Sequence, residues 1–87
     1  MNIREILAHN VKLYRVRLSL TQEELSEKCM DVNEDESLTD ALSNRSYISD
    51  IEACRRNISL DKIGTLAKAL EKEPYELFIT HATTERL

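Results

Sequence analysis

The residues of this chain that could do chemistry gather in the stretch RSYISDIEACRRN, residues 45–57. Ile48 and Ile51 recur at the three-residue spacing of an inward helical face. Four polar side chains then fall on the outward face: Arg45, Ser46, Ser49 and Asp50. Their hydrogen-bond donors and acceptors could read base edges, and such a helix fits a DNA major groove. A solvated helix face is the plainer alternative.

A basic loop formed by Arg55, Arg56 and Asn57 follows this helix directly. Basic residues after a helix can complement the helix dipole, and they can also bind phosphates. Arg45 at the exposed first turn could donate two parallel hydrogen bonds to guanine, and Asp50 could accept one from cytosine N4. The residue types therefore suit nucleic-acid recognition without requiring it.

These residues need a scaffold, and the composition predicts a helical one. One glycine and one proline in 87 residues, with few alternating β-branched or aromatic positions, indicate an all-α fold. We expect five short helices around one core. Four of them are expected at residues 3–17, 22–30, 45–53 and 74–79. The other, fourth in chain order, is capped by Ser59 and has an apolar stripe formed by Leu60, Ile63, Leu66, Ala67 and Leu70.

Local signals support these helices. Apolar residues recur at spacings of three and four in the first: Ile3, Leu7, Val11, Tyr14 and Leu18. Thr21 and Glu24 form a capping box before the second helix, where Leu25 and Cys29 face inward. Asn44 suits the N-cap of the third helix, and Pro74 suits the first position of the fifth.

The chain length predicts a single domain over residues 1–79, with a polar tail at 80–87. We expect no secretory signal, because the sequence shows no basic-then-apolar leader. We also expect a soluble protein, because no apolar run approaches the roughly 20 residues of a membrane span. The two cysteines favour a reducing cytoplasm over a disulfide scaffold. Since no zinc-ligand spacing, phosphate loop or catalytic carboxylate pair is present, we expect no metal, no cofactor, no small-molecule ligand and no enzymatic activity.

An acidic segment, Asp31 to Ser43, separates the second helix from the third. The chain has 16 acids and 12 bases, and five of the acids lie here, so the remainder carries eleven acids against twelve bases. The segment could be an elaborated loop that tucks Leu38 and Leu42 onto the core. It could instead lower non-specific DNA affinity, or contact a partner. Calcium binding is disfavoured, because Glu36 and Leu42 replace the glycine and the bidentate glutamate of an EF-hand loop.

Three segments together resemble the helix-turn-helix regulators typified by lambda repressor and Cro: NVKLYRVRLSLTQEELSEK, SYISDIE and RRNISLDKIGTLAKALEKEPYELF. They span residues 10–78 and occur in the family's order. The SYISDIE and RRNIS segments look particularly like controller proteins of restriction–modification systems. The acidic segment is an insertion into this pattern. Ser19 stands where the family usually has the turn glycine before the second helix, and the turn tolerates this change. Cys54 stands where the family usually has glycine after the third helix, which leaves the placement of Arg55 and Arg56 open.

The resemblance implies a role for each candidate residue. Gln22 would contact the DNA backbone, as would Arg55, Arg56 and Asn57 in the loop. Bases would be read by Asn44, Arg45, Ser46, Ser49 and Asp50. Arg15 and Glu52 would form a structural ion pair that joins the first helix to the end of the third.

The family often dimerises through its last helix, so Tyr75 and Ile79 are the expected interface residues. We therefore expect a dimeric, sequence-specific DNA-binding transcription regulator of prokaryotic or phage type, which binds a near-palindromic operator and regulates its own operon. The alternative is an antitoxin-like protein–protein interaction module, which would bind a partner through the insertion or the last helix.

Overall fold

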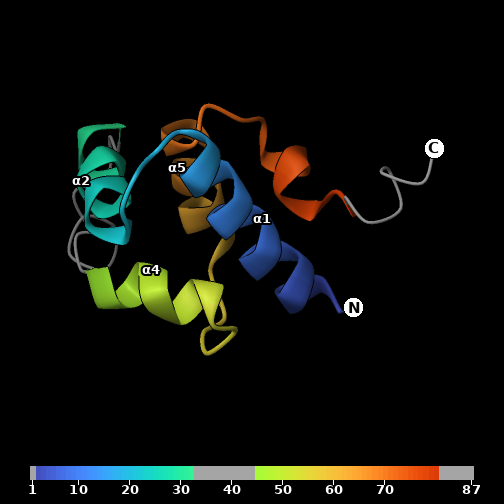
Figure 1. The fold of residues 1–87 in the computed structure, drawn as a ribbon. Coiled ribbons are helices and arrows are strands. Elements are labelled where there is room, and N and C mark those ends of the chain that lie inside the picture. Colours follow the sequence, from blue (N-terminus) through green and yellow to red (C-terminus); the bar gives the residue numbers. More distant parts are fainter. Residues whose placement is uncertain (1, 33–44, 81–87) are drawn as a thin grey trace.

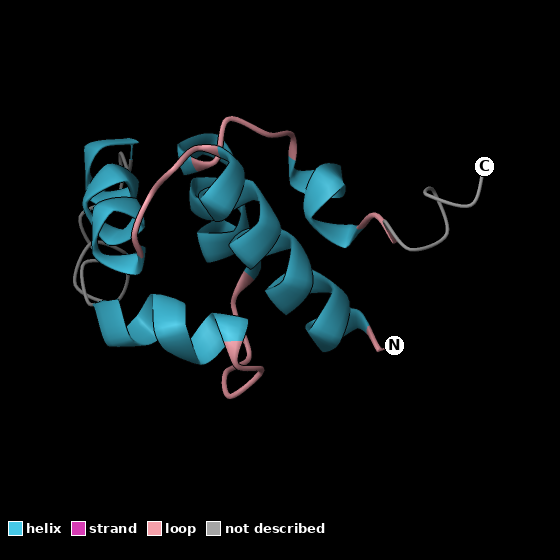
Figure 2. Cartoon of the chain, viewed as in Figure 1, coloured by secondary structure: helices cyan, strands magenta, loops and turns pink. Residues whose placement is uncertain are grey.

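Helices form all of the regular structure in the residues that the computed structural model describes, which are 2–32 and 45–80. In chain order they are α1 (Ile3–Arg17), α2 (Gln22–Val32), α4 (Arg45–Glu52), α5 (Leu60–Ala69) and the 3-10 helix η1 (Pro74–Phe78) (Figure 1). Only helices and loops are drawn for this part of the chain in Figure 2, which confirms the all-α expectation. None of the described helices is long and apolar enough to cross a membrane.

Helix α1 begins at an N-cap and buries one face. The side-chain oxygen of Asn2 accepts a hydrogen bond from the Glu5 N–H at 2.9 Å, which satisfies one of the free amides of the first turn. Leu7, Val11 and Tyr14 are buried, as their spacing predicts. Ile3 shares that spacing but is 68% exposed, so the buried part of this face begins at Leu7. Ile3 lies in the first turn, beyond the packed part of the core.

Helix α2 begins at the predicted capping box. The Thr21 N–H donates to Glu24 Oε1 at 2.8 Å, and the Glu24 N–H donates to Thr21 Oγ1 at 3.0 Å. Leu25 and Cys29 are fully buried, as expected. The helix continues to Val32, two residues beyond its predicted end. The rest of the acidic segment and the expected N-cap Asn44 lie outside the described residues.

The core is built where α1, α2, α4 and α5 meet. The inward residues of α4, Ile48 and Ile51, are buried as predicted. Ser59 is the N-cap of α5, and its Oγ accepts a hydrogen bond from the Lys62 N–H at 3.3 Å. The helix ends one residue before the buried Leu70. Leu60 was expected in the apolar stripe of α5 but is 85% exposed, because the first residue of the helix projects past the core.

Two residues beyond the end of α1, of α4 and of α5 lies a residue in the left-handed backbone conformation, and none of the three is a glycine. Ser19, Cys54 and Glu71 have φ values of 59°, 62° and 60°. Each is followed by an N–H that bonds back across the helix end, as when the Arg55 N–H donates to the Asp50 carbonyl at 2.8 Å. Cys54 thus adopts the strained conformation, and the chain turns back so that the basic loop, residues 55–57 (the arginine loop), lies beside α4.

The fifth predicted helix is a single 3-10 helix, η1, and not an α-helix. Pro74 provides its first position, and the side chains of Glu73 and Glu76 cap its start reciprocally. It ends at Phe78, one residue before the predicted Ile79. Five residues between fixed ends are enough for the tighter helix, which is common in such short segments.

Helix α1 lies beside η1 (Figure 1), and side chains of α1 donate hydrogen bonds to carbonyls of this segment. The buried Asn10 amide donates to the carbonyl oxygens of Leu77 at 2.8 Å and Ile79 at 2.9 Å. The Tyr14 hydroxyl donates to the Glu76 carbonyl at 2.8 Å. Burial is the main cause that raises the pKa of Tyr14, so this hydroxyl remains a donor at neutral pH.

Candidate nucleic-acid interface

A largely buried ion pair fixes the end of α4 against α1. Arg15 Nε lies 2.7 Å from Glu52 Oε2, and Arg15 Nη2 lies 3.0 Å from Glu52 Oε1. The two side chains are only 13% and 6% exposed. Arg15 also donates to the Leu20 carbonyl at 2.7 Å, and Gln22 Nε2 donates to Glu52 Oε1 at 3.2 Å. The start of α2 and the end of α4 are therefore joined to α1 by one network.

The face of α4 that points away from the core is polar. Ser46 is exposed, and Ser49 and Asp50 are partly exposed, whereas Ile48 and Ile51 are buried. Arg45 begins the helix, but its side chain lies outside what the structure describes, as does the whole of Asn44. Three of the five residues predicted to read bases can thus be placed, and they share one face.

Asp50 contacts both arginines of the loop. One carboxylate oxygen, Oδ1, lies 2.9 Å from Arg55 Nη2 and 3.0 Å from Arg55 Nε. The other, Oδ2, lies 3.1 Å from Arg56 Nε. Hydrogen bonds from Arg56 and Arg55 hold the pKa of the Asp50 carboxyl below its usual value. The predicted base reader and two predicted phosphate contacts therefore form one cluster.

Tyr47 and Lys62 complete this cluster, and sequence reasoning missed both. The Arg56 guanidinium lies 4.6 Å from the centre of the Tyr47 ring, and Lys62 Nζ lies 4.8 Å from it. Tyr47 is 5% exposed, so its ring is a fixed support for two cations. The available signal was the position of Tyr47 directly before the inward Ile48, which places an aromatic ring at the edge of the buried face.

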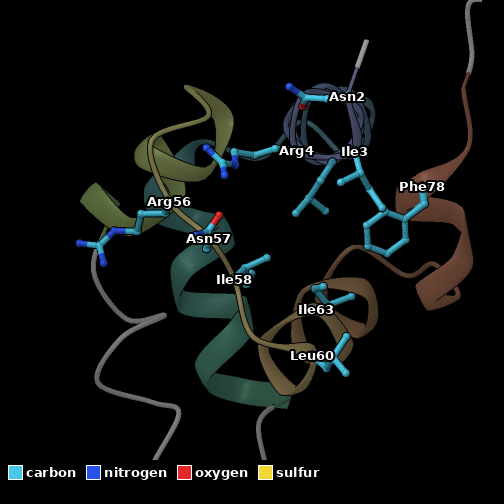
Figure 3. Close-up of a pocket in the computed structure, with 10 residues that line it drawn as sticks. Asn2, Ile3, Arg4, Arg56, Asn57, Ile58, Leu60, Ile63 and Phe78 are labelled. Atoms are coloured by element: carbon cyan, nitrogen blue, oxygen red, sulfur yellow. The ribbon is translucent and has the colours of Figure 1, made fainter.

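A groove opens beside the arginine loop, between the start of α1, the start of α5 and η1 (Figure 3). Its volume is about 570 Å³. Ile3, Leu60 and Phe78 give it an apolar lining, and Arg56 and Asn57 lie at its rim. The Arg56 side chain points away from the apolar part in Figure 3. Asn57 is exposed, as a surface contact requires.

The two residues predicted at a dimer interface differ in exposure. Tyr75 is 67% exposed, although the 3-10 helix that carries it is packed on α1. Ile79 is half-buried, and its carbonyl is held by Asn10. An exposed aromatic ring on a fixed helix is a usable contact surface.

The described part of the chain contains no group of three or more histidine, cysteine or acidic residues that could hold a metal ion. Both cysteines are free thiols, Cys29 in the core and Cys54 half-buried at the end of α4. Burial raises the pKa of the Cys29 thiol to about 12, since the core cannot solvate a thiolate.

Comparison with known structures identifies the class of protein. The crystal structure of a hypothetical transcription factor from Neisseria superposes with a TM-score of 0.78 and 30% sequence identity, over 98% of this chain and 84% of that one. The chain shares its fold with this transcription factor, which places it in the class of helix-turn-helix transcription regulators.

Sequence relatives narrow the class to a family. The chain is 38% identical to control protein C.BamHI of Bacillus amyloliquefaciens over 77 residues, 87% of this chain and 80% of the relative. It is 40% identical to control protein C.SmaI of Serratia marcescens over 70 residues, 80% of this chain and 69% of the relative. The chain belongs to this family of control proteins.

A third relative is longer than the chain. A hypothetical transcription factor of Neisseria meningitidis is 33% identical over 78 residues, which cover 90% of this chain but only 62% of the relative. The chain thus spans less than two thirds of that relative's length. No family model matches the sequence.

Proposed function

We propose that this protein is a sequence-specific DNA-binding transcription regulator that places α4 in the major groove. The observation that supports this proposal most strongly is that side-chain contacts fix α4 with its polar face outward. The Arg15–Glu52 pair fixes one end of the helix, and exposed arginines lie beside its outward face. A helix fixed in this way can present donors and acceptors to base edges in one register.

The proposed roles divide between base edges and backbone. Asn44, Arg45, Ser46 and Ser49 read bases from the start and the outward face of α4. Gln22, Arg55, Arg56 and Asn57 contact phosphates. Lys62 joins this second group, because its ammonium lies over the same Tyr47 ring as Arg56. Phosphate contacts set the register, and base contacts select the sequence.

The protein acts as a dimer on a near-palindromic operator. The exposed Tyr75, with Ile79 beside it, supports a two-fold contact between η1 segments. Two recognition helices would then meet half-sites about 34 Å apart. Membership of the control-protein family supports autoregulation within a restriction–modification operon, through protein concentration and cooperative binding.

Selection of bound duplexes from a random DNA pool tests the proposal. We expect an enriched, near-palindromic sequence, and a dimer in ultracentrifugation with that duplex. Arg45→Ala should weaken binding by about 1–3 kcal/mol, mainly at one base pair of each half-site. A pool that shows no enrichment after repeated rounds would contradict sequence-specific binding. Binding to another protein that persists at high salt would favour the interaction-module alternative.

A further inference from the structure

One carboxylate faces two arginines at the end of α4. The side chains of Arg55 and Arg56 are 61% and 49% exposed, whereas that of Asp50 is 25% exposed. The three side chains together carry a net charge of +1. Because the arginines are open to solvent, an anion from outside can reach the guanidinium groups that Asp50 now holds.

The two arginines are not held equally. Arg56 is bound by Asp50 and also packs against the Tyr47 ring at 4.6 Å. Among the described residues, the ion-pair partner of Arg55 is Asp50 alone. Loss of the carboxylate would therefore release Arg55 more completely than Arg56.

The contacts on Arg55 resemble those that a phosphate would make. Its Nε and Nη2 both donate to Asp50 Oδ1, so the carboxylate occupies the side of the guanidinium that suits an oxyanion. A guanidinium has five donors, which leaves the Nη1 edge for an additional partner. A phosphate must displace Asp50 or share Arg55 with it.

We propose that the Asp50 carboxylate takes the place of a DNA phosphate on the two arginines. In this way Asp50 lowers the affinity for random DNA and raises the discrimination between a selected site and random DNA. The proposal rests on the DNA-binding function proposed above. On random DNA, affinity comes from charge, and Asp50 cancels one positive charge. On a selected site the phosphates meet the arginines in one fixed register. Asp50 holds the two guanidinium groups in a fixed orientation, and this gain in affinity offsets the loss from the positive charge that Asp50 cancels.

Binding of Asp50→Asn to two duplexes of equal length, one selected from a random pool and one scrambled, tests this inference. Removing the carboxylate adds one net positive charge, equivalent to about one more neutralised phosphate, so the slope of log affinity against log salt should steepen by about 0.9 on the scrambled duplex. The same slope implies about fivefold tighter binding to that duplex at ~0.15 M salt. We expect a less than about twofold change on the selected duplex, so discrimination falls.

Three control variants separate the role of Asp50 from general effects of charge. Asp50→Glu keeps the carboxylate and should retain the wild-type salt slope. Glu27→Gln removes an exposed acid of α2 and should leave discrimination unchanged. Asp50→Asn combined with Arg55→Gln removes the released cation and should restore the wild-type slope. Thermal melts confirm that each variant is folded.

The outcomes distinguish the inference from the function on which it rests. Wild-type protein that binds neither duplex at low salt would overturn the proposed function and this inference with it. Wild-type protein that binds DNA, with an Asp50→Asn variant whose slope and discrimination are unchanged, would overturn the inference alone. An equal gain on both duplexes would also overturn it, because Asp50 would then set affinity but not discrimination.

Discussion

Two carboxylates on the same short helix meet arginines in opposite surroundings. Glu52 and Arg15 are 6% and 13% exposed, and they join α4 to α1. Asp50 is 25% exposed, and its partners Arg55 and Arg56 are about half exposed or more. The donor and acceptor groups are the same, and the distances are similar. The difference lies in how much water reaches each pair.

The solvent exposure of each ion pair determines whether another anion can replace its carboxylate. A buried charge that loses its partner has no water to replace it, so the Glu52 pair fixes geometry. An exposed pair gains little over solvated ions, and another anion can replace its carboxylate at small cost. Helix α4 therefore carries one ion pair that fixes it to α1, at Glu52, and one whose carboxylate another anion can replace, at Asp50.

Removal of Glu52 should give the largest effect. Glu52→Ala leaves Arg15 partly buried without a counter-ion, and we expect a loss of about 3 kcal/mol in the free energy of unfolding, measured in urea. Lys28→Ala breaks the exposed pair with Glu71 and should cost less than about 1 kcal/mol. Equal losses from the two variants would show that burial does not separate the pairs.

The buried thiol of Cys29 makes the stability of the protein depend on pH. The pKa of Cys29 is raised to about 12 in the folded protein, above its value in the unfolded chain. Its contribution to stability is therefore complete below pH 9 and is lost as the pH rises toward 12. By pH 11 the wild type should lose about 3 kcal/mol more than Cys29→Ala, compared by urea unfolding. Parallel pH profiles would contradict this expectation.

Substitution of Cys54 tests whether the turn that brings Arg55 and Arg56 back to Asp50 is strained. Its left-handed backbone costs a non-glycine residue about 1–2 kcal/mol, and glycine entropy offsets part of the relief. Cys54→Gly should raise the free energy of unfolding by about 1 kcal/mol and leave the arginine cluster in place. Ser19→Gly, at φ 59°, should give a similar gain. Destabilisation by both variants would argue against strain at these turns.

Local sequence signals predicted the elements but not all of their ends. The capping box at Thr21 and the burial of Leu25 follow from interactions within one helix turn. Leu60 and Ile3 match the helical period yet are exposed, because periodicity gives the direction of a side chain and not the extent of its neighbours. Too few residues separate Pro74 from the end of η1 for sequence to distinguish a 3-10 helix from an α-helix.

The arginine cluster could be predicted only in part. The residue types predicted phosphate contacts for Arg55 and Arg56 and a base contact for Asp50. The contacts among these three side chains depend on the left-handed turn at Cys54. Sequence could not determine whether a cysteine would accept that conformation. The contact between Tyr47 and Lys62 joins two helices across this turn, so it too required the folded structure.

Side-chain NMR of the arginine Nε–H groups during titration with a selected duplex tests the central contrast most directly. We predict that the signals of Arg55 and Arg56 shift as phosphate replaces or shares Asp50. The signal of Arg15 should stay in place, because its pair with Glu52 is buried and fixes the fold. A shift of Arg15 with unchanged Arg55 and Arg56 would contradict the account.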